Sequence, residues 1–149
     1  MHVDTHQRIS ELLGSESLAV VATSDGGAPY CSLVAIAPTA APLVYFATTR
    51  STHKWENLIA DPRVSVLVDN RNNDPADFHE AVAATGVGLA QECLGEDAVN
   101  ARAALLGRHP YLADFLESPS TAMVRVDIDR WYVVARFQQV DCVDCAALS

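Results

Sequence analysis

Short apolar segments separated by turn-forming residues run through most of this chain, a pattern typical of β-strands. Residues 17–23, 29–37 and 43–47 are rich in aliphatic and aromatic side chains. The first two segments are joined by Asp25-Gly26-Gly27, which favours a tight hairpin turn. Prolines at both ends of residues 38–42 favour a second turn before the third segment. We therefore expect three consecutive antiparallel strands.

Helical periodicity marks other parts of the chain, and it predicts helices over residues 5–13, 52–60, 96–106 and 110–116. The second of these ends before Asp61-Pro62, because proline disfavours a helical conformation in the residue that precedes it. In the third, Val99, Ala103 and Leu106 share one face, and we expect that face to be buried.

The later strands are expected over residues 64–68, 81–90, 122–128 and 131–140, the last two joined by a turn at Asp129-Arg130. Gly86 and Gly88 suggest a bend in the second of these strands. About six or seven strands, mostly connected by hairpins, favour a mainly β (α+β) fold with flanking helices. Closure into an antiparallel barrel is favoured because it removes exposed strand edges.

Composition narrows the classes of function. The 149 residues are enough for one domain, with a core at about residues 17–140 and a tail at 141–149. A net charge of -9 with only 10 Lys+Arg argues against nucleic-acid binding, which requires a basic surface. No apolar run approaches the ~20 residues of a membrane span. The N-terminal sequence lacks the pattern of a secretory signal, so we expect a cytoplasmic protein without membrane contact.

A Cys-x-x-Cys pair, Cys142 and Cys145, lies near the C-terminus. Such a pair is half of a zinc site or a redox motif, but no second ligand pair accompanies it. We interpret it as an incidental feature of the tail and expect no metal site, with thiol redox chemistry or metal capture as the alternative.

Basic and hydroxyl side chains are concentrated in residues 48–54, which follow the third predicted strand and lead into a predicted helix. The segment reads Thr48-Thr49-Arg50-Ser51-Thr52-His53-Lys54, and Lys54 is the only lysine of the chain. Hydroxyl donors, cations and a helix N-terminus are the groups that bind a phosphate monoester. The alternative is an ordinary polar loop in which Thr52 only caps the helix.

The order of these pieces resembles the pyridoxamine phosphate oxidase-like, FMN-binding split β-barrel family. The resemblance is carried by residues 28–34, 43–48, Ser51-Thr52-His53-Lys54, Asn57-Leu58, Asp61-Pro62-Arg63 and 131–137. It implies a split β-barrel that binds FMN at the interface of a homodimer.

The resemblance also implies roles for individual residues. Lys54 matches the lysine that binds the FMN phosphate, and His53 matches the adjacent arginine or histidine. Thr48 matches the threonine beside the flavin, and Ser32, Leu33 and Val34 match the strand that lies along the isoalloxazine ring. We add Thr49, Arg50, Ser51 and Trp131 as cofactor-binding candidates, with core or interface packing as the alternative for Trp131.

Two departures bear on the activity. Ser32 stands where true pyridoxamine phosphate oxidases have an arginine, and Arg136-Phe137-Gln138 lacks their Arg-x-His pair. A related haem-binding branch uses a histidine near the C-terminus, but none follows His109 here. We therefore expect an FMN-dependent oxidoreductase that acts on an unknown small-molecule substrate, not on pyridoxamine phosphate. The alternatives are a non-enzymatic flavin or haem protein serving in binding, storage or sensing, and a barrel without a cofactor.

Overall fold

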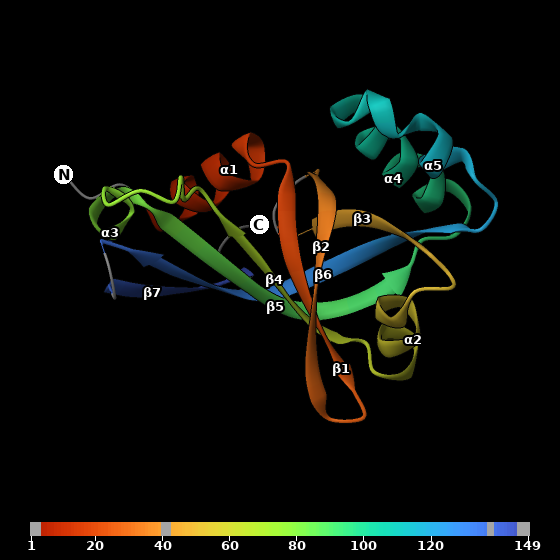
Figure 1. The fold of residues 1–149 in the computed structure, drawn as a ribbon, viewed down its shortest axis with the longest axis horizontal. Helices are drawn as coiled ribbons and strands as arrows, with labels where there is room; N and C mark the ends of the chain where they lie inside the picture. Colours follow the sequence, from red (N-terminus) through yellow and green to blue (C-terminus); the bar gives the residue numbers. More distant parts are fainter. Residues whose placement is uncertain (1–3, 40–42, 137–138, 146–149) are drawn as a thin grey trace.

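Six antiparallel strands close into a barrel, and a seventh extends it, in the computed structural model, which describes residues 4–39, 43–136 and 139–145 (Figure 1). The sheet order is β3-β2-β1-β4-β5-β6-β7, and pairing of β3 with β6 closes the barrel. The strands are β1 (Leu18–Asp25), β2 (Ala28–Pro38), β3 (Leu43–Thr49), β4 (Arg63–Asp69), β5 (Val82–Glu92), β6 (Thr121–Ala135) and β7 (Gln139–Asp144). The predicted mainly β barrel is confirmed.

Helices close one end of the barrel and cover part of its outer surface. The helical elements are α1 (Thr5–Ser15), α2 (His53–Ala60), α3 (Asp77–Glu80), α4 (Gly95–Arg108), the 3-10 turn η1 (Pro110–Leu112) and α5 (Ala113–Glu117). Helix α1 buries Ile9, Leu12 and Leu13 in the barrel core. Helices α4 and α5 form a separate layer on the outside (Figure 1), and their Leu105 and Leu116 pack in a second apolar cluster with β3 and β6.

The N-terminal half follows the sequence prediction closely. The β1–β2 turn places Gly26 and Gly27 at φ +58° and +97°, conformations that favour glycine. The Thr52 hydroxyl caps α2 by accepting a hydrogen bond from the Trp55 N–H at 3.2 Å. The predicted turn at 38–42 falls largely on residues outside the described part, as do Phe137 and Gln138.

The strands of the C-terminal half require three corrections. The strand predicted over residues 131–140 is not one strand, because it covers the end of β6 and the start of β7. The predicted turn at Asp129-Arg130 is wrong: β6 runs without a break from Thr121 to Ala135. Arg130 pairs with Val87 on β5, whereas Ile128 pairs with the next residue, Gly88. The register therefore shifts by one residue, and Asp129 is the extra residue of a β-bulge. The predicted tail is also partly strand, since Cys142 pairs with Tyr132 in β7 and Cys145 is buried in the barrel core.

Helix α4 presents a different face to the barrel from the one predicted. Val99 is 60% exposed, whereas Ala101 and Leu105 are buried. Asp97 lies on the same face as these two residues and accepts hydrogen bonds from Tyr45 at 2.9 Å and Arg125 at 3.2 Å. These contacts fix the rotation of a helix whose small apolar residues occur on several sides.

No helix among the described residues is long and apolar enough to cross a membrane.

Candidate functional site

The barrel is open along one side of β2. Strand β2 pairs with β1 over Ala28–Ala35, but its pairing with β3 is limited to Ile36–Pro38. The segment 28–35 therefore has no strand partner on that side within the described chain. The Ile36 N–H donates to the Ser17 carbonyl on the β1 side. Successive N–H groups of a strand point to alternate sides, so those of Ser32 and Val34 also point towards β1, whereas the Leu33 N–H points towards the open edge.

The start of α2 supplies the second part of the site. The Lys54 Nζ donates to the Thr48 Oγ1 at 3.0 Å, and this oxygen lies 2.9 Å from the Thr52 Oγ1. Thr48 is buried and Lys54 is half-buried. The last residues of β3 and the cap of α2 thus hold the ammonium group in a fixed position at the helix N-terminus.

Of the basic side chains in this segment, only Lys54 has no acidic partner within the described residues. Arg50 forms an ion pair with Glu92 at 2.6 Å and donates to the Pro119 carbonyl at 3.0 Å. His53 lies 2.9 Å from the Asp25 carboxylate. Partial burial lowers the pKa of Lys54, because the ammonium form loses water contacts. The site therefore contains one positive charge that no carboxylate of the described chain offsets.

The structure gathers most of the predicted cofactor residues around the first turn of α2. Thr49 and Ser51 lie in the turn that leads into α2, with their hydroxyl oxygens 3.4 Å apart, and Ser51 is exposed. Ser32, Leu33 and Val34 lie instead on β2, and Trp131 lies on β6. The Trp131 side chain is fully buried in the barrel core, so we leave it out of the candidate site.

Sequence reasoning missed the partners of these residues. Asp25 and Tyr30 at the β1–β2 hairpin contact His53, and Asn57 bonds to the buried Thr23 hydroxyl at 3.0 Å. These contacts join segments about 30 residues apart, and no local pattern marks them. No group of three or more His, Cys, Asp or Glu side chains in residues 4–39, 43–136 and 139–145 is placed to hold a metal ion.

The model of the family described as pyridoxamine 5'-phosphate oxidase matches residues 5–135. The chain belongs to the pyridoxamine 5'-phosphate oxidase family. No curated protein is similar enough in sequence to count as a match.

Solved structures at low sequence identity share the fold of this family member. A heme binding protein from Mycobacterium smegmatis superposes with a TM-score of 0.89 at 17% identity, covering 99% of this chain and 61% of that one. The General Stress Protein 26 from Bacillus anthracis has a TM-score of 0.72 at 18% identity, with 93% and 97% covered. A FAD-binding protein from Mesorhizobium loti has a TM-score of 0.70 at 18% identity, with 88% and 94% covered. This chain thus spans less than two thirds of the length of the first of these proteins.

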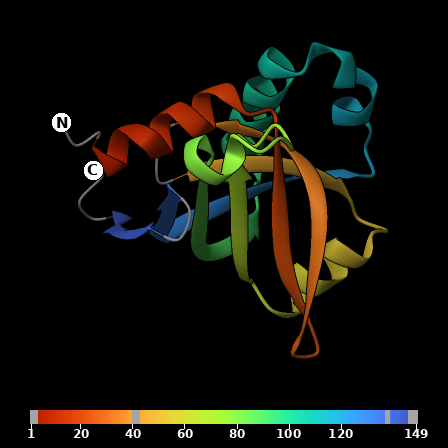
Figure 2. The same cartoon turned by 60° about the vertical axis from the view of Figure 1, so that its left-hand side comes forward.

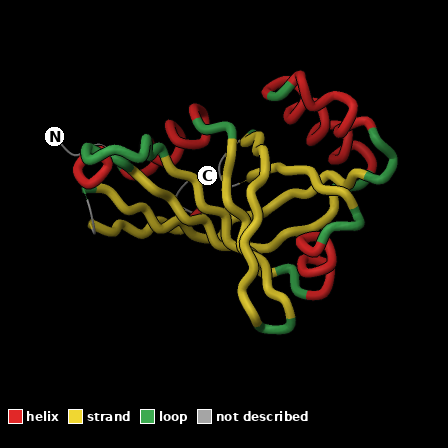
Figure 3. The backbone as a smooth tube through the Cα atoms, in the orientation of Figure 1, coloured by secondary structure: helices red, strands yellow, loops and turns green. Residues whose placement is uncertain are grey.

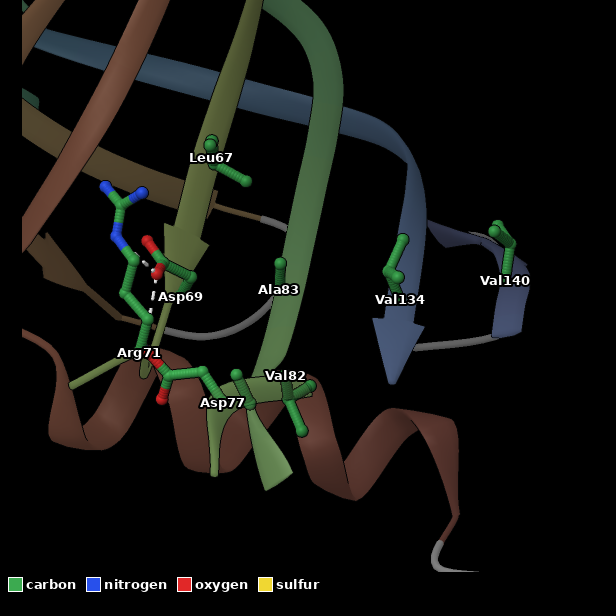
Figure 4. A pocket seen from close by; sticks show the side chains of 9 residues that line it. Leu67, Asp69, Arg71, Asp77, Val82, Ala83, Val134 and Val140 are labelled. Atoms are coloured by element: carbon green, nitrogen blue, oxygen red, sulfur yellow. Dashed lines mark hydrogen bonds and ion pairs between the residues drawn. The ribbon is translucent and has the colours of Figure 1, made fainter. Parts of the chain in front are cut away.

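The chain also has an apolar pocket of about 570 Å³ at the C-terminal end of β4, near Asp69. Helix α2 precedes the N-terminal end of this strand. The walls of the pocket come from β4, β5, β6 and β7, with Leu67, Ala83, Val134 and Val140 among the labelled side chains (Figure 4). The Arg71 guanidinium at its rim is paired with Asp69 at 3.1 Å. The size suits a small molecule, but the pocket contains none of the predicted cofactor residues.

Proposed function

We propose that this chain is an FMN-binding flavoprotein and an oxidoreductase acting on a small molecule. The observation that carries the proposal is the Lys54 ammonium group, which is half-buried and hydrogen-bonded to Thr48 at the start of α2. A cation in this position is stabilised by an anionic partner, and a phosphate monoester is the anion that the neighbouring hydroxyls and helix N-terminus also favour. The Arg50 and His53 side chains are committed to Glu92 and Asp25, so Lys54 is the principal phosphate ligand in this proposal.

The other residues have more limited roles. Thr48 and Thr52 orient Lys54 and the helix start, whereas the exposed Ser51 hydroxyl is available as a further phosphate donor. Along the open edge of β2, the Leu33 N–H is directed to donate to the acceptor edge of the isoalloxazine ring. When bound, the flavin supplies the electron or hydride transfer, and hydrogen bonds to its ring adjust its redox potential.

A homodimer is part of the proposal. The outer face of β1, β4 and β5 carries the apolar side chains of Leu18, Leu67 and Ala83. This face continues to Leu33 on β2, and the side chains of Leu18 and Leu33 are 51% and 65% exposed. A second copy packed against this face removes that apolar surface from water next to the open edge. A cytoplasmic location completes the proposal, supported by four cysteines that are all free.

An absorption spectrum of the protein as purified tests the cofactor. We expect the near-ultraviolet and visible absorption bands of an oxidised flavin. Acid release and chromatography of the bound flavin are then expected to identify it as FMN. The intense absorption band of a haem in place of the flavin bands contradicts the proposal, and so does a colourless protein that takes up no added FMN.

Flavin reduction then tests the activity. Anaerobic addition of a reduced nicotinamide cofactor is expected to bleach the bound flavin by hydride transfer, and oxygen or another electron acceptor is expected to restore its colour. A bound flavin that no donor reduces supports the non-enzymatic alternative.

A further inference from the structure

The β1–β2 hairpin extends beyond the barrel as a two-stranded ribbon (Figure 1, Figure 2 and Figure 3). Strand β1 pairs with β4 only over Val20–Ala22, and β2 pairs with β3 only over Ile36–Pro38. From Thr23 to Tyr30 the ribbon has no further strand beside it in the described chain. An isolated hairpin is marginally stable in water, so contacts with another element must fix its position.

Helix α2 supplies these contacts. The Asn57 Nδ2 donates to the Thr23 Oγ1 at 3.0 Å, and both side chains are buried. The Thr23 hydroxyl in turn donates to the Tyr30 carbonyl on the opposite strand at 3.4 Å. One turn earlier in the helix, the His53 ring stacks on Tyr30 at 4.5 Å between centroids, and its Nε2 lies 2.9 Å from the Asp25 Oδ2.

We refer to Thr23, Asp25, Tyr30, His53 and Asn57 as the ribbon clamp. His53 and Asn57 are four residues apart and lie on one face of α2. Lys54, the next residue after His53, instead donates to Thr48 on β3. The same helix therefore holds the ribbon on one side and presents the proposed phosphate ligand on another.

The clamp connects the two halves of the proposed cofactor site. Lys54 lies on α2, and Leu33 lies on β2 next to the free ribbon, where its partner Val20 also pairs with β4 and so holds it in the barrel. The clamp attaches α2 to the ribbon that continues these same two strands, and in this way it contributes to the span between the phosphate ligand and the open strand edge. We propose that the ribbon clamp consists of positioning residues that set this span and so determine the preference for a phosphorylated flavin over riboflavin.

This inference rests on the proposed function and assigns His53 a different role from direct phosphate binding. If His53 bound the phosphate itself, loss of Asp25 would free the imidazole and strengthen FMN binding. If His53 instead holds the ribbon, loss of Asp25 loosens the clamp and weakens FMN binding. The two roles predict changes of opposite sign for Asp25→Ala.

The experiment compares dissociation constants for FMN and riboflavin in wild-type protein, Thr23→Val, Thr23→Ser and Asp25→Ala. Valine keeps the volume of Thr23 but removes its hydroxyl. We expect Thr23→Val to reduce the preference for FMN by about tenfold, the effect of about one hydrogen bond, and Thr23→Ser to restore it. Asp25→Ala is expected to reduce the preference in the same direction. Because Asp25 is 55% exposed, this variant tests the clamp even if Thr23→Val fails to fold.

The control is Thr121→Val, which removes a buried hydroxyl that has no hydrogen-bond partner in the described structure. It is expected to leave both dissociation constants unchanged. The inference is contradicted if Thr23→Val weakens the binding of FMN and riboflavin equally, or if it lowers the melting temperature but leaves the preference for FMN intact. Tighter FMN binding by Asp25→Ala also contradicts it. A wild-type protein that binds neither flavin refutes the proposed function itself. A wild-type protein that binds FMN, with clamp variants that bind it equally well, refutes only the inference about the clamp.

Discussion

Charge compensation distinguishes the basic residues of the candidate site from one another. Arg50 and His53 each contact a carboxylate, whereas the Lys54 ammonium contacts only a hydroxyl among the described residues. A half-buried ammonium loses water contacts, which is why the pKa of Lys54 is lowered. An anionic ligand would offset that loss, and the burial of Lys54 therefore supports the proposed phosphate binding.

The two C-terminal cysteines are expected to respond differently to serine substitution. Cys145 is buried in the barrel core, and burial raises the pKa of its thiol to about 11. Cys145→Ser places a hydroxyl among apolar neighbours and is expected to cost about 1–3 kcal/mol of stability. Cys142 is exposed on β7, so Cys142→Ser serves as the control with little change. Chemical denaturation measures both, and equal stability of the two variants would show that Cys145 is not packed as described.

At the residue scale, the sequence identified the cationic segment because its members are neighbours in the chain. Local spacing brings Thr48, Thr52 and Lys54 together once a strand precedes and a helix follows. It gives no information on Glu92 or Asp25, which come from other elements. For the same reason, the assignment of His53 to the ribbon clamp could only come from the folded chain.

At the element scale, apolar periodicity located most of the strands and helices, but it missed α3, the boundary between β6 and β7 and the irregularity of β6. The pattern contains a polar pair, Asp129-Arg130, that is typical of a turn. The structure accommodates it as a bulge, because the extra residue lets the long strand bend around the barrel. The periodicity of α4 likewise did not predict which face is buried, because hydrogen bonds from Tyr45 and Arg125 on other strands to this helix determine its orientation.

Gly88 provides a direct test of the bulge. A Cβ added at this position would lie 1.9 Å from the Asp127 carbonyl oxygen, a backbone atom that cannot move aside easily. Gly88→Ala is therefore expected to lower the free energy of unfolding by about 2 kcal/mol or more. Gly107→Ala is the control, because it lies in α4 with open space around it and is expected to raise stability by roughly 0.5–1 kcal/mol. Urea denaturation of both proteins gives the comparison, and a stable Gly88→Ala variant would argue against this strand register.

The attachment of α4 is expected to depend on pH through Asp97. Burial acts to raise the pKa of Asp97, but hydrogen bonds from Tyr45, Arg125 and Cys93 outweigh it and lower the pKa below the usual 3.8. A carboxylate whose pKa is lowered in the folded state stabilises it above the unfolded pKa, and this contribution is lost as the pH falls. The wild-type protein should therefore melt higher than Asp97→Asn at neutral pH, and the difference should shrink below about pH 4. A difference that stays constant with pH would contradict an electrostatic role for this carboxylate.

At the scale of the whole molecule, the uncovered apolar face of β1, β4 and β5 predicts self-association. Light scattering is expected to give twice the mass of the chain. Leu18→Asp places a charge on this face and is expected to shift the protein towards the monomer. Leu94→Asp, at a leucine that is 72% exposed at the start of α4, is expected to leave the dimer intact. A wild-type monomer, or equal behaviour of the two variants, would contradict this choice of interface.

The central claim is that Lys54 binds the phosphate of FMN, and fluorescence titration of Lys54→Ala with FMN and with riboflavin tests it most directly. We expect FMN to bind roughly 10- to 100-fold more weakly than to the wild-type protein, the range for loss of a hydrogen bond to a charged group. Riboflavin, which has no phosphate, should bind the two proteins equally. Arg50→Ala is the control, because Arg50 is committed to Glu92 and its loss should have a smaller effect. Equal weakening of FMN and riboflavin in Lys54→Ala would contradict the account.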